Sequence, residues 1–170
     1  MDFLQLAADR FSVRSFKPDP VPEEIREKII KAGLLAPTAK NNQPQKIIAV
    51  SSAGGLEKIK KCTASHYNAP LAFIIGYDKT LCWQRSFDGK TSGDIDASIV
   101  TTHMMLQAAS IGIGSTWVMF FDPEAVKSEF EFDGNTEPVA ILVMGYPADD
   151  CKPSPRHFEY KDPGEIVSYK

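Results

Sequence analysis

The chain has 170 residues, of which 43% are hydrophobic, and a formal net charge of −3. This length and composition predict one domain with a well-formed core. The negative charge argues against nucleic acid as a general partner, and no apolar run reaches the roughly 18 residues that a membrane helix requires. The first residues include Asp2 and show no basic-then-apolar signal pattern, so we expect a cytoplasmic protein without membrane contact.

The cysteines and histidines show neither a CxxC motif nor the spacing of metal ligands. We therefore expect reduced thiols, no disulfide framework and no metal site. His103 falls in an apolar helical pattern and is interpreted as a hydrogen-bonded core histidine, not a catalyst. The residues concerned are Cys62, Cys82, Cys151, His66, His103 and His157.

The chain begins with a short amphipathic helix, predicted over Met1–Asp9, and then an extended stretch over Arg10–Phe16. Alternate residues of an extended chain share a face, so Arg10, Ser12 and Arg14 lie on one side. Guanidinium and hydroxyl groups gathered in this way form an anion pocket that suits phosphate. Taken alone, the stretch also matches a solvated basic face on an edge strand. A motif of only seven residues often matches by chance, so the stretch by itself favours this second interpretation.

The second helix is predicted from Pro22, which the first helical turn tolerates, to Ala36, where Pro37 ends it. A polar loop follows over Ala36–Gln45, with four amide side chains in five residues. Amides donate and accept, so they can bind the edge of a flavin or nucleobase ring. The alternative is an ordinary turn, in which Asn and Pro are common for conformational reasons. The amides are Asn41, Asn42, Gln43 and Gln45.

Two buried strands come next, over Lys46–Ser51 and Leu71–Tyr77, with a glycine turn and a helix over Leu56–Ala64 between them. The polar segment Asp78–Gly93 is too long for a plain connector. We expect it to lie over a binding site, although its aromatic residues can also serve to pack it down.

The stretch Asp94–Phe121 predicts a long helix capped by Asp94 or Asp96 and ended by Gly112 and Gly114. Its apolar residues fall on nearly all sides. Such a helix either lies at the centre of the core or is shared with a second subunit. A strand over Ser115–Phe121 follows.

The last third of the chain predicts a helix from Asp122 to about Phe130 and a third buried strand over Val139–Met144, introduced by Pro138. Arg156 follows a polar loop. The tail Glu165–Lys170 has a strand-like pattern, and we expect it to pair with another subunit.

Four segments, in this order, resemble the FMN-dependent nitroreductase-like flavoproteins and together span nearly the whole chain. They are Arg10-x-Ser12-x-Arg14, Ala36-Pro37-Thr38-Ala39-x-Asn41-x-Gln43-Pro44, the long helix running into Gly112-Ile113-Gly114-Ser115-x-Trp117, and Val139–Met144 with Gly145-Tyr146-Pro147 and then Arg156. The resemblance implies a single domain over residues 1–170 with an α+β nitroreductase-like fold. Its central mixed or antiparallel sheet would be flanked by helices, in an intertwined homodimer whose interface is the long central helix.

The resemblance also implies FMN at the subunit interface. Arg10, Ser12 and Arg156 would hold its phosphate, and Arg14 would lie near the pyrimidine end of the ring. The loop from Pro37 would come from the other subunit, and the segment from Trp117 would run past the ring. The expected cofactor-binding residues are Arg10, Phe11, Ser12, Arg14, Pro37, Thr38, Ala39, Asn41, Gln43, Trp117, Val118, Met119, Phe120 and Arg156.

The implied activity is that of an NAD(P)H oxidoreductase, in which NADH or NADPH reduces FMN and a nitroaromatic, quinone or related small acceptor is then reduced, with ping-pong kinetics. The cofactor carries this chemistry, so no catalytic side chain is expected. The alternative function is a non-catalytic module that stores or senses FMN. The sequence has no dinucleotide-binding fingerprint.

Overall fold

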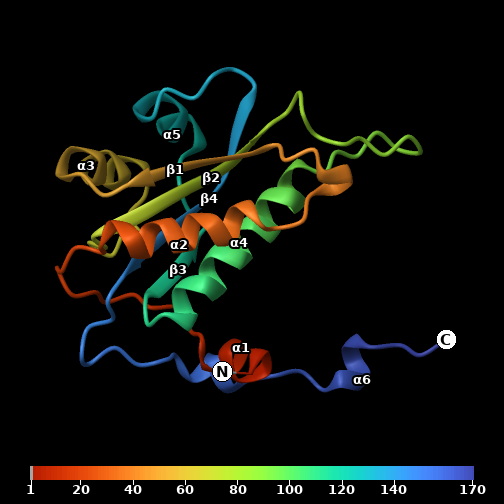
Figure 1. Cartoon of the computed structure of the whole chain (residues 1–170). Helices are drawn as coiled ribbons and strands as arrows, with labels where there is room; N and C mark the ends of the chain where they lie inside the picture. Colours follow the sequence, from red (N-terminus) through yellow and green to blue (C-terminus); the bar gives the residue numbers. More distant parts are fainter. Residues whose placement is uncertain (1) are drawn as a thin grey trace.

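The computed structural model describes residues 2–170, which form an antiparallel four-stranded sheet with helices on both faces (Figure 1). The strands run in the order β1-β2-β4-β3, and every neighbouring pair is antiparallel. This arrangement confirms the predicted α+β fold. The strands are β1 (Gln45–Val50), β2 (Leu71–Asp78), β3 (Gly114–Val118) and β4 (Thr136–Gly145).

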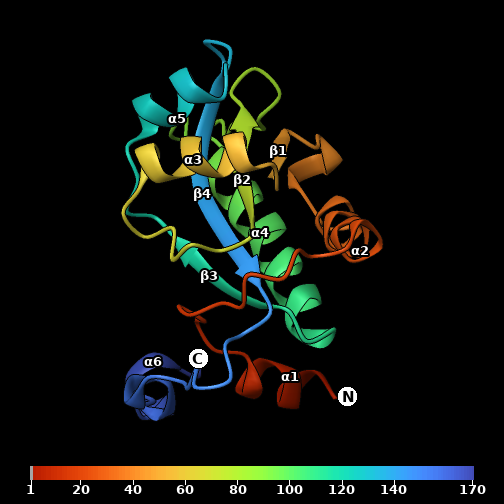
Figure 2. The same cartoon turned by 90° about the vertical axis from the view of Figure 1, so that its left-hand side faces the viewer.

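The helices divide between the two faces of the sheet (Figure 2). On one face lie α2 (Glu23–Leu34) and α4 (Gly93–Ser110), and on the other lie α3 (Ala53–Cys62) and α5 (Pro123–Glu129). The short α1 (Phe3–Asp9) and α6 (Pro163–Ile166) lie near the two ends of the chain, and the 3-10 turns are η1 (Ala39–Asn41) and η2 (Pro155–Phe158). The first helix was predicted from Met1, which lies outside the described residues.

The two central strands are buried on both sides, which explains their unbroken apolar sequences. Successive side chains of a strand point to opposite faces. In β2, Phe73 and Ile75 therefore pack under α2 and α4, whereas Ala72 and Ile74 pack under α3 and α5. Strand β4 divides its side chains in the same way. The sheet is thus the shared wall of two hydrophobic cores.

Strand β4 is longer than predicted, because it continues through Pro138 to Thr136. Proline is tolerated within a sheet at bulges, where the missing N–H breaks no regular ladder bond. The register of β2 against β4 shifts at this point, from Ile75 opposite Ala140 to Gly76 opposite Pro138. Gly76 packs so tightly here that a Cβ atom on it would lie 2.4 Å from the carbonyl oxygen of Glu137.

We expect Gly76→Ala to lower the free energy of unfolding by about 1–3 kcal/mol, the usual cost of an added carbon in a tightly packed site. Gly54→Ala is the matched control, because nothing lies within 4 Å of a Cβ at that position. Gly54 lies in a helix, where alanine is favoured by about 0.5–1 kcal/mol. Urea unfolding of both variants checks the prediction, and equal midpoints would show that the bulge can absorb the methyl group.

Helix α4 buries one face in the core and leaves another open. Val100 and Met104 are fully buried, whereas Ile95 is 52% exposed. An open cavity of about 430 Å³ lies along the outer side, lined by Asp94, Ile95, Ser98, Ile99, Thr102 and His103. The first of the two predicted alternatives, a helix at the centre of the core, is therefore not what the single chain shows. The structure leaves the other half of the prediction, a helix shared with a second subunit, untested.

Three other predictions about α4 and its neighbours need correction. Ser92, and neither of the two aspartates, occupies the N-cap position, and Asp96 lies inside the helix. His103 is half-buried on the open face and not in the core, with its Nδ1 donating to the carbonyl of Ile99 at 2.9 Å. Strand β3 ends at Val118, so residues 119–121 have left the sheet.

The predicted glycine turn before α3 is part of the helix itself. The side chain of Ser52 caps α3 by accepting from the N–H of Gly55 at 3.1 Å, so the helix begins at Ala53. The predicted tail, residues 165–170, begins with two helical residues, and its pairing with another subunit is untested. Asp162 accepts from the N–H of Gly164 at 2.7 Å and Pro163 takes the first helical position, so α6 forms there. Within residues 2–170 the tail joins no strand.

The segment between β2 and α4, residues 79–92, projects from the body as a narrow loop (Figure 1). A bridge joins Gln84 to Thr91, and the guanidinium of Arg85 donates to the carboxylate of Asp88. Phe87 at its tip is 94% exposed. This aromatic residue therefore does not pack the segment down.

Candidate functional site

The basic stretch after α1 lies beside β3. Ser12 forms a parallel bridge with Ser115, and the N–H of Val13 donates to the carbonyl of Ser115 at 2.9 Å. The hydroxyl of Thr116 donates to the carbonyl of Val13. Val13 is buried, so its neighbours Ser12 and Arg14 face the other way, as the alternating pattern predicts.

Three guanidiniums meet in one open cavity of about 470 Å³, which we call the arginine cavity. Arg10, Ser12 and Arg14 line it from the N-terminal stretch, and Arg156 reaches it from η2, more than 140 residues further along the chain. Phe11, Ser154 and His157 complete the lining. Within residues 2–170 none of the three arginines forms an ion pair with a carboxylate. Their positive charge is therefore available to an anion.

Ser154 and His157 line this cavity but were not predicted from the sequence. The Nε2 atom of His157 donates to the carbonyl of Ala8 at 2.8 Å, because a carbonyl can only accept. The imidazole also packs edge-on against Phe11, with ring centroids 6.3 Å apart. These contacts tie η2 to the end of α1 and bring Arg156 to the cavity. Their only sequence signal was the nearness of His157 to Arg156.

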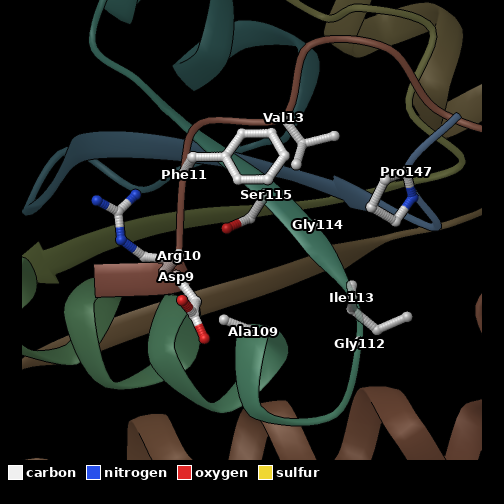
Figure 3. Close-up of a pocket in the computed structure, with 10 residues that line it drawn as sticks. All are labelled: Asp9, Arg10, Phe11, Val13, Ala109, Gly112, Ile113, Gly114, Ser115 and Pro147. Atoms are coloured by element: carbon white, nitrogen blue, oxygen red, sulfur yellow. The ribbon is translucent and has the colours of Figure 1, made fainter. Parts of the chain in front are cut away.

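A second, smaller cavity of about 150 Å³ shares Arg10 and Phe11 with the first (Figure 3). Its other wall is the turn after α4, from Gly112 to Ser115, together with Ala109. Gly112 has φ +79°, the left-handed geometry of a helix C-cap, and the N–H of Ile113 returns to the carbonyl of Ala108 at 2.9 Å. The predicted glycine motif therefore positions β3 beside Arg10.

The amide-rich loop lies at the opposite end of α4. The N–H of Ala39 donates to the carboxylate of Asp96 at 2.9 Å, near the start of the helix. Ala109, which lines the cavity beside Arg10, is thirteen residues further along. At 1.5 Å per residue, these two points of α4 are about 20 Å apart. Within one chain, then, the structure does not bring Thr38, Ala39, Asn41 and Gln43 to the arginine cavity.

The loop backbone is unusual. Lys40, Asn41 and Gln43 have φ values of 51°, 56° and 51°, in the left-handed region that residues other than glycine seldom adopt. Each such residue costs about 1–2 kcal/mol. Contacts from outside and across the loop offset this cost, including the N–H of Gln43, which donates to the hydroxyl of Thr38 at 3.0 Å.

The end of β3 presents the last group of predicted residues. Val118 is buried, whereas Met119 and Phe120 are exposed. The hydroxyl of Thr63 donates to the carbonyl of Phe120 at 2.5 Å, and the N–H of Asp122 donates to the carbonyl of Cys62 at 2.9 Å. The buried Nε1–H of Trp117 has no acceptor in residues 2–170. A buried donor without an acceptor is one that a ligand or a second chain can satisfy.

The three cysteine side chains lie outside the arginine cavity. Within residues 2–170 all three are free thiols. Burial raises the pKa of the Cys62 thiol. Burial and then the Asp96 carboxylate raise the pKa of Cys82. Both thiols therefore stay neutral and unreactive near pH 7. Between Asp2 and Lys170, no three His, Cys, Asp or Glu side chains converge as metal ligands.

Comparison with known proteins shows which family has these segments in the same order along the chain. A model of the Nitroreductase family matches residues 7–146. The chain belongs to the nitroreductase family. The match covers the N-terminal arginine stretch, the amide-rich loop, α4 and all four strands, and it confirms the resemblance found in the sequence.

Individual family members agree with this assignment. A crystal structure of a nitroreductase family protein from Clostridium difficile 630 is 42% identical, covers 100% of this chain and 99% of its own, and superposes with a TM-score of 0.94. An FMN-dependent nitroreductase from Clostridium difficile R20291 is 26% identical, covers 98% of both chains and has a TM-score of 0.77. An NADH dehydrogenase from Thermus thermophilus is 25% identical over 92% of each chain. The predicted nitroreductase-like fold is therefore confirmed.

No helix in residues 2–170 has both the length and the apolar character needed to cross a membrane.

Proposed function

We propose that this nitroreductase family member is an FMN-dependent NAD(P)H oxidoreductase that works as a homodimer. The observation that carries the proposal is the cavity in which Arg10, Ser12 and Arg14 meet Arg156. Three guanidiniums without carboxylate partners in the described chain, together with two serine hydroxyls, form the donor set that a phosphate requires. The residues present therefore fit the phosphate end of FMN.

The roles of the other residues are those that the resemblance to the nitroreductase family implies. Arg10, Ser12 and Arg156 hold the phosphate, with Phe11, Ser154 and His157 shaping its surroundings. Arg14 would lie near the pyrimidine end of the ring, where a cation would stabilise negative charge and make reduction easier. Residues Trp117–Phe120 would run beside the ring, and Trp117 has a buried N–H donor without an acceptor in residues 2–170.

The amide-rich loop belongs to the site of the other subunit. The length of α4, about 20 Å between Asp96 and Ala109, separates Pro37, Thr38, Ala39, Asn41 and Gln43 from the cavities beside Arg10 in their own chain. A second copy packed against the open face of α4 can bring its loop to that cavity. The two sites of a homodimer are then each completed in trans, and the 170 residues act as one FMN-binding domain.

FMN, when bound, supplies the hydride chemistry between a reduced nicotinamide and an acceptor. The protein would position the ring, and no acid–base side chain would be needed. Donor and acceptor would bind in turn at the same place, which would give ping-pong kinetics. The donor is NADH or NADPH, and the acceptor is a small nitroaromatic, quinone or related molecule in the cytoplasm.

The test of this activity is steady-state oxidation of NADH and of NADPH, with a quinone or a nitroaromatic as acceptor. We expect turnover with parallel lines in double-reciprocal plots at several acceptor concentrations, the pattern of ping-pong kinetics. An FMN-loaded protein that oxidises neither nucleotide would contradict the enzyme and would support the alternative, a module that stores or senses FMN.

The projecting segment 79–92 is expected to select the acceptor. Phe87→Ala should change the KM for aromatic acceptors by about three- to tenfold. The reason is that losing apolar contact equal to one or two buried methylene groups weakens binding by about 1 kcal/mol. FMN content should not change, because Phe87 lies outside the arginine cavity. Acceptor kinetics and flavin content of the same preparation check both statements, and lost flavin with unchanged KM would place the segment at the cofactor.

A further inference from the structure

A buried carboxylate links two segments that the proposed function assigns to different tasks. The side chain of Asp96, in α4, is 1% exposed. Its Oδ1 atom accepts from the N–H of Ala39 at 2.9 Å, and its Oδ2 atom accepts from the hydroxyl of Ser92 at 2.7 Å. No Lys, Arg or His within residues 2–170 pairs with it. Each oxygen thus serves a different segment.

The contact with Ala39 supports the amide-rich loop from outside. That loop has three residues other than glycine in the left-handed region, at Lys40, Asn41 and Gln43. A backbone of this kind persists when its surroundings fix it. The carboxylate holds the loop at its first turn, and the first turn of α4 is a favourable place for a negative charge.

The contact with Ser92 reaches the projecting segment 79–92. Ser92 is 5% exposed, and its N–H donates to the carbonyl of Trp83 at 2.9 Å. A second link runs beside the first, because the side-chain amide of Asn42 donates to the carbonyl of Leu81 at 3.0 Å. The loop and the segment are therefore joined at two points, one of them through Asp96.

We propose that Asp96 is a positioning residue that couples the amide-rich loop, at residues 38–43, to the projecting segment 79–92. The inference rests on the proposed function, in which the loop contacts FMN and the segment faces the acceptor. FMN that orders the loop then also orders the segment through the Asp96 carboxylate. The coupling makes the acceptor side of the site complete only when the cofactor is in place.

The readout is cleavage of the segment by trypsin, after Lys79, Arg85 and Lys90, measured with and without FMN. In the unaltered protein FMN should slow this cleavage severalfold. Asp96→Leu keeps the branched shape of the side chain but has no acceptor atom, so both contacts are lost. We expect FMN to bind about tenfold more weakly, as for the loss of a hydrogen bond to a charged group, and to protect the segment no longer.

Ser92→Ala separates the two contacts, since it removes the hydroxyl and leaves the bond from Ala39 intact. This variant should bind FMN with nearly unchanged affinity and yet lose part of the protection of the segment, because the amide of Asn42 still donates to the carbonyl of Leu81. Thr101→Val is the matched control, because the Thr101 hydroxyl is equally buried in α4 but donates to the carbonyl of Ala97 in its own helix. It should keep both FMN affinity and protection.

Protection by FMN that is the same in Asp96→Leu, Ser92→Ala and Thr101→Val would overturn the coupling. If Asp96→Leu does not fold, Ser92→Ala and Thr101→Val decide the question alone. An unaltered protein that takes up no FMN would be a failure of the proposed function, and the coupling would fall with it. That failure is visible before any variant is made, so a failure of the proposed function can be distinguished from a failure of the coupling alone.

Discussion

Arg10→Ala is expected to weaken FMN binding by about 1.5–3 kcal/mol, the usual effect of losing a charge-assisted contact. Arg10 is half-buried and lines both the arginine cavity and the smaller cavity beside it. Its guanidinium forms no ion pair in residues 2–170, so the change leaves no carboxylate without a partner. Fluorescence titration of the apoprotein with FMN measures the effect.

Riboflavin makes this experiment specific, since it has the same ring as FMN but lacks the phosphate. Arg10→Ala should leave riboflavin binding nearly unchanged. Arg26→Ala is the control for lost charge, because Arg26 lies on α2 and donates to the hydroxyl of Ser51 at 2.7 Å, away from the cavity. Equal weakening of FMN and riboflavin, or equal effects of the two arginines, would refute the phosphate assignment.

Ile95→Glu is expected to split the dimer and release the flavin together. Ile95 is 52% exposed on the open face of α4, so a glutamate there does not disturb the core of the chain. In the dimer it would bury an unpaired charge, which costs several kcal/mol per ion. Met105 is less suitable for this purpose, because it packs partly against the core.

Sedimentation and visible absorbance of the same sample measure subunit number and flavin content at once. Ala53→Glu is the control, at the exposed start of α3 on the other face of the sheet, where a negative charge suits the helix N-terminus. It should remain a yellow dimer. An Ile95→Glu protein that is still a yellow dimer would show that this face of α4 is not the interface.

Much of the fold could be predicted from local pattern. The unbroken apolar runs at Leu71–Tyr77 and Val139–Met144 indicate buried strands, because only a strand covered on both faces has no polar side. The alternation of Arg10, Ser12 and Arg14 predicts that the three side chains share one face, and all three line the same cavity. The local sequence carries both signals.

Other features depend on partners that are distant in the sequence. His157 enters the site through a contact with Ala8, and Asp96 anchors Ala39 across 57 positions. Neither pairing leaves a periodic signal. At α3 and α6 the side-chain caps of Ser52 and Asp162 outweigh a glycine pair and a strand-like pattern. A cap contributes about 1 kcal/mol, enough to decide a short element.

The apolar pattern of α4 indicates an unusual helix but does not reveal the cause. Within the chain one side of the helix is covered and Ile95 is not. The sequence could not distinguish a second layer of core from a second copy, because both demand the same apolar residues. The arginine cavity and the amide-rich loop, at opposite ends of this helix, favour the second copy.

The measurement that tests the central claim most directly is the visible absorption spectrum of the purified protein, followed by chromatography of whatever heat releases. We predict a flavin spectrum and one FMN per subunit. A colourless protein that also takes up no added FMN would contradict the cofactor site, and the guanidiniums of Arg10, Arg14 and Arg156 would then require another anion.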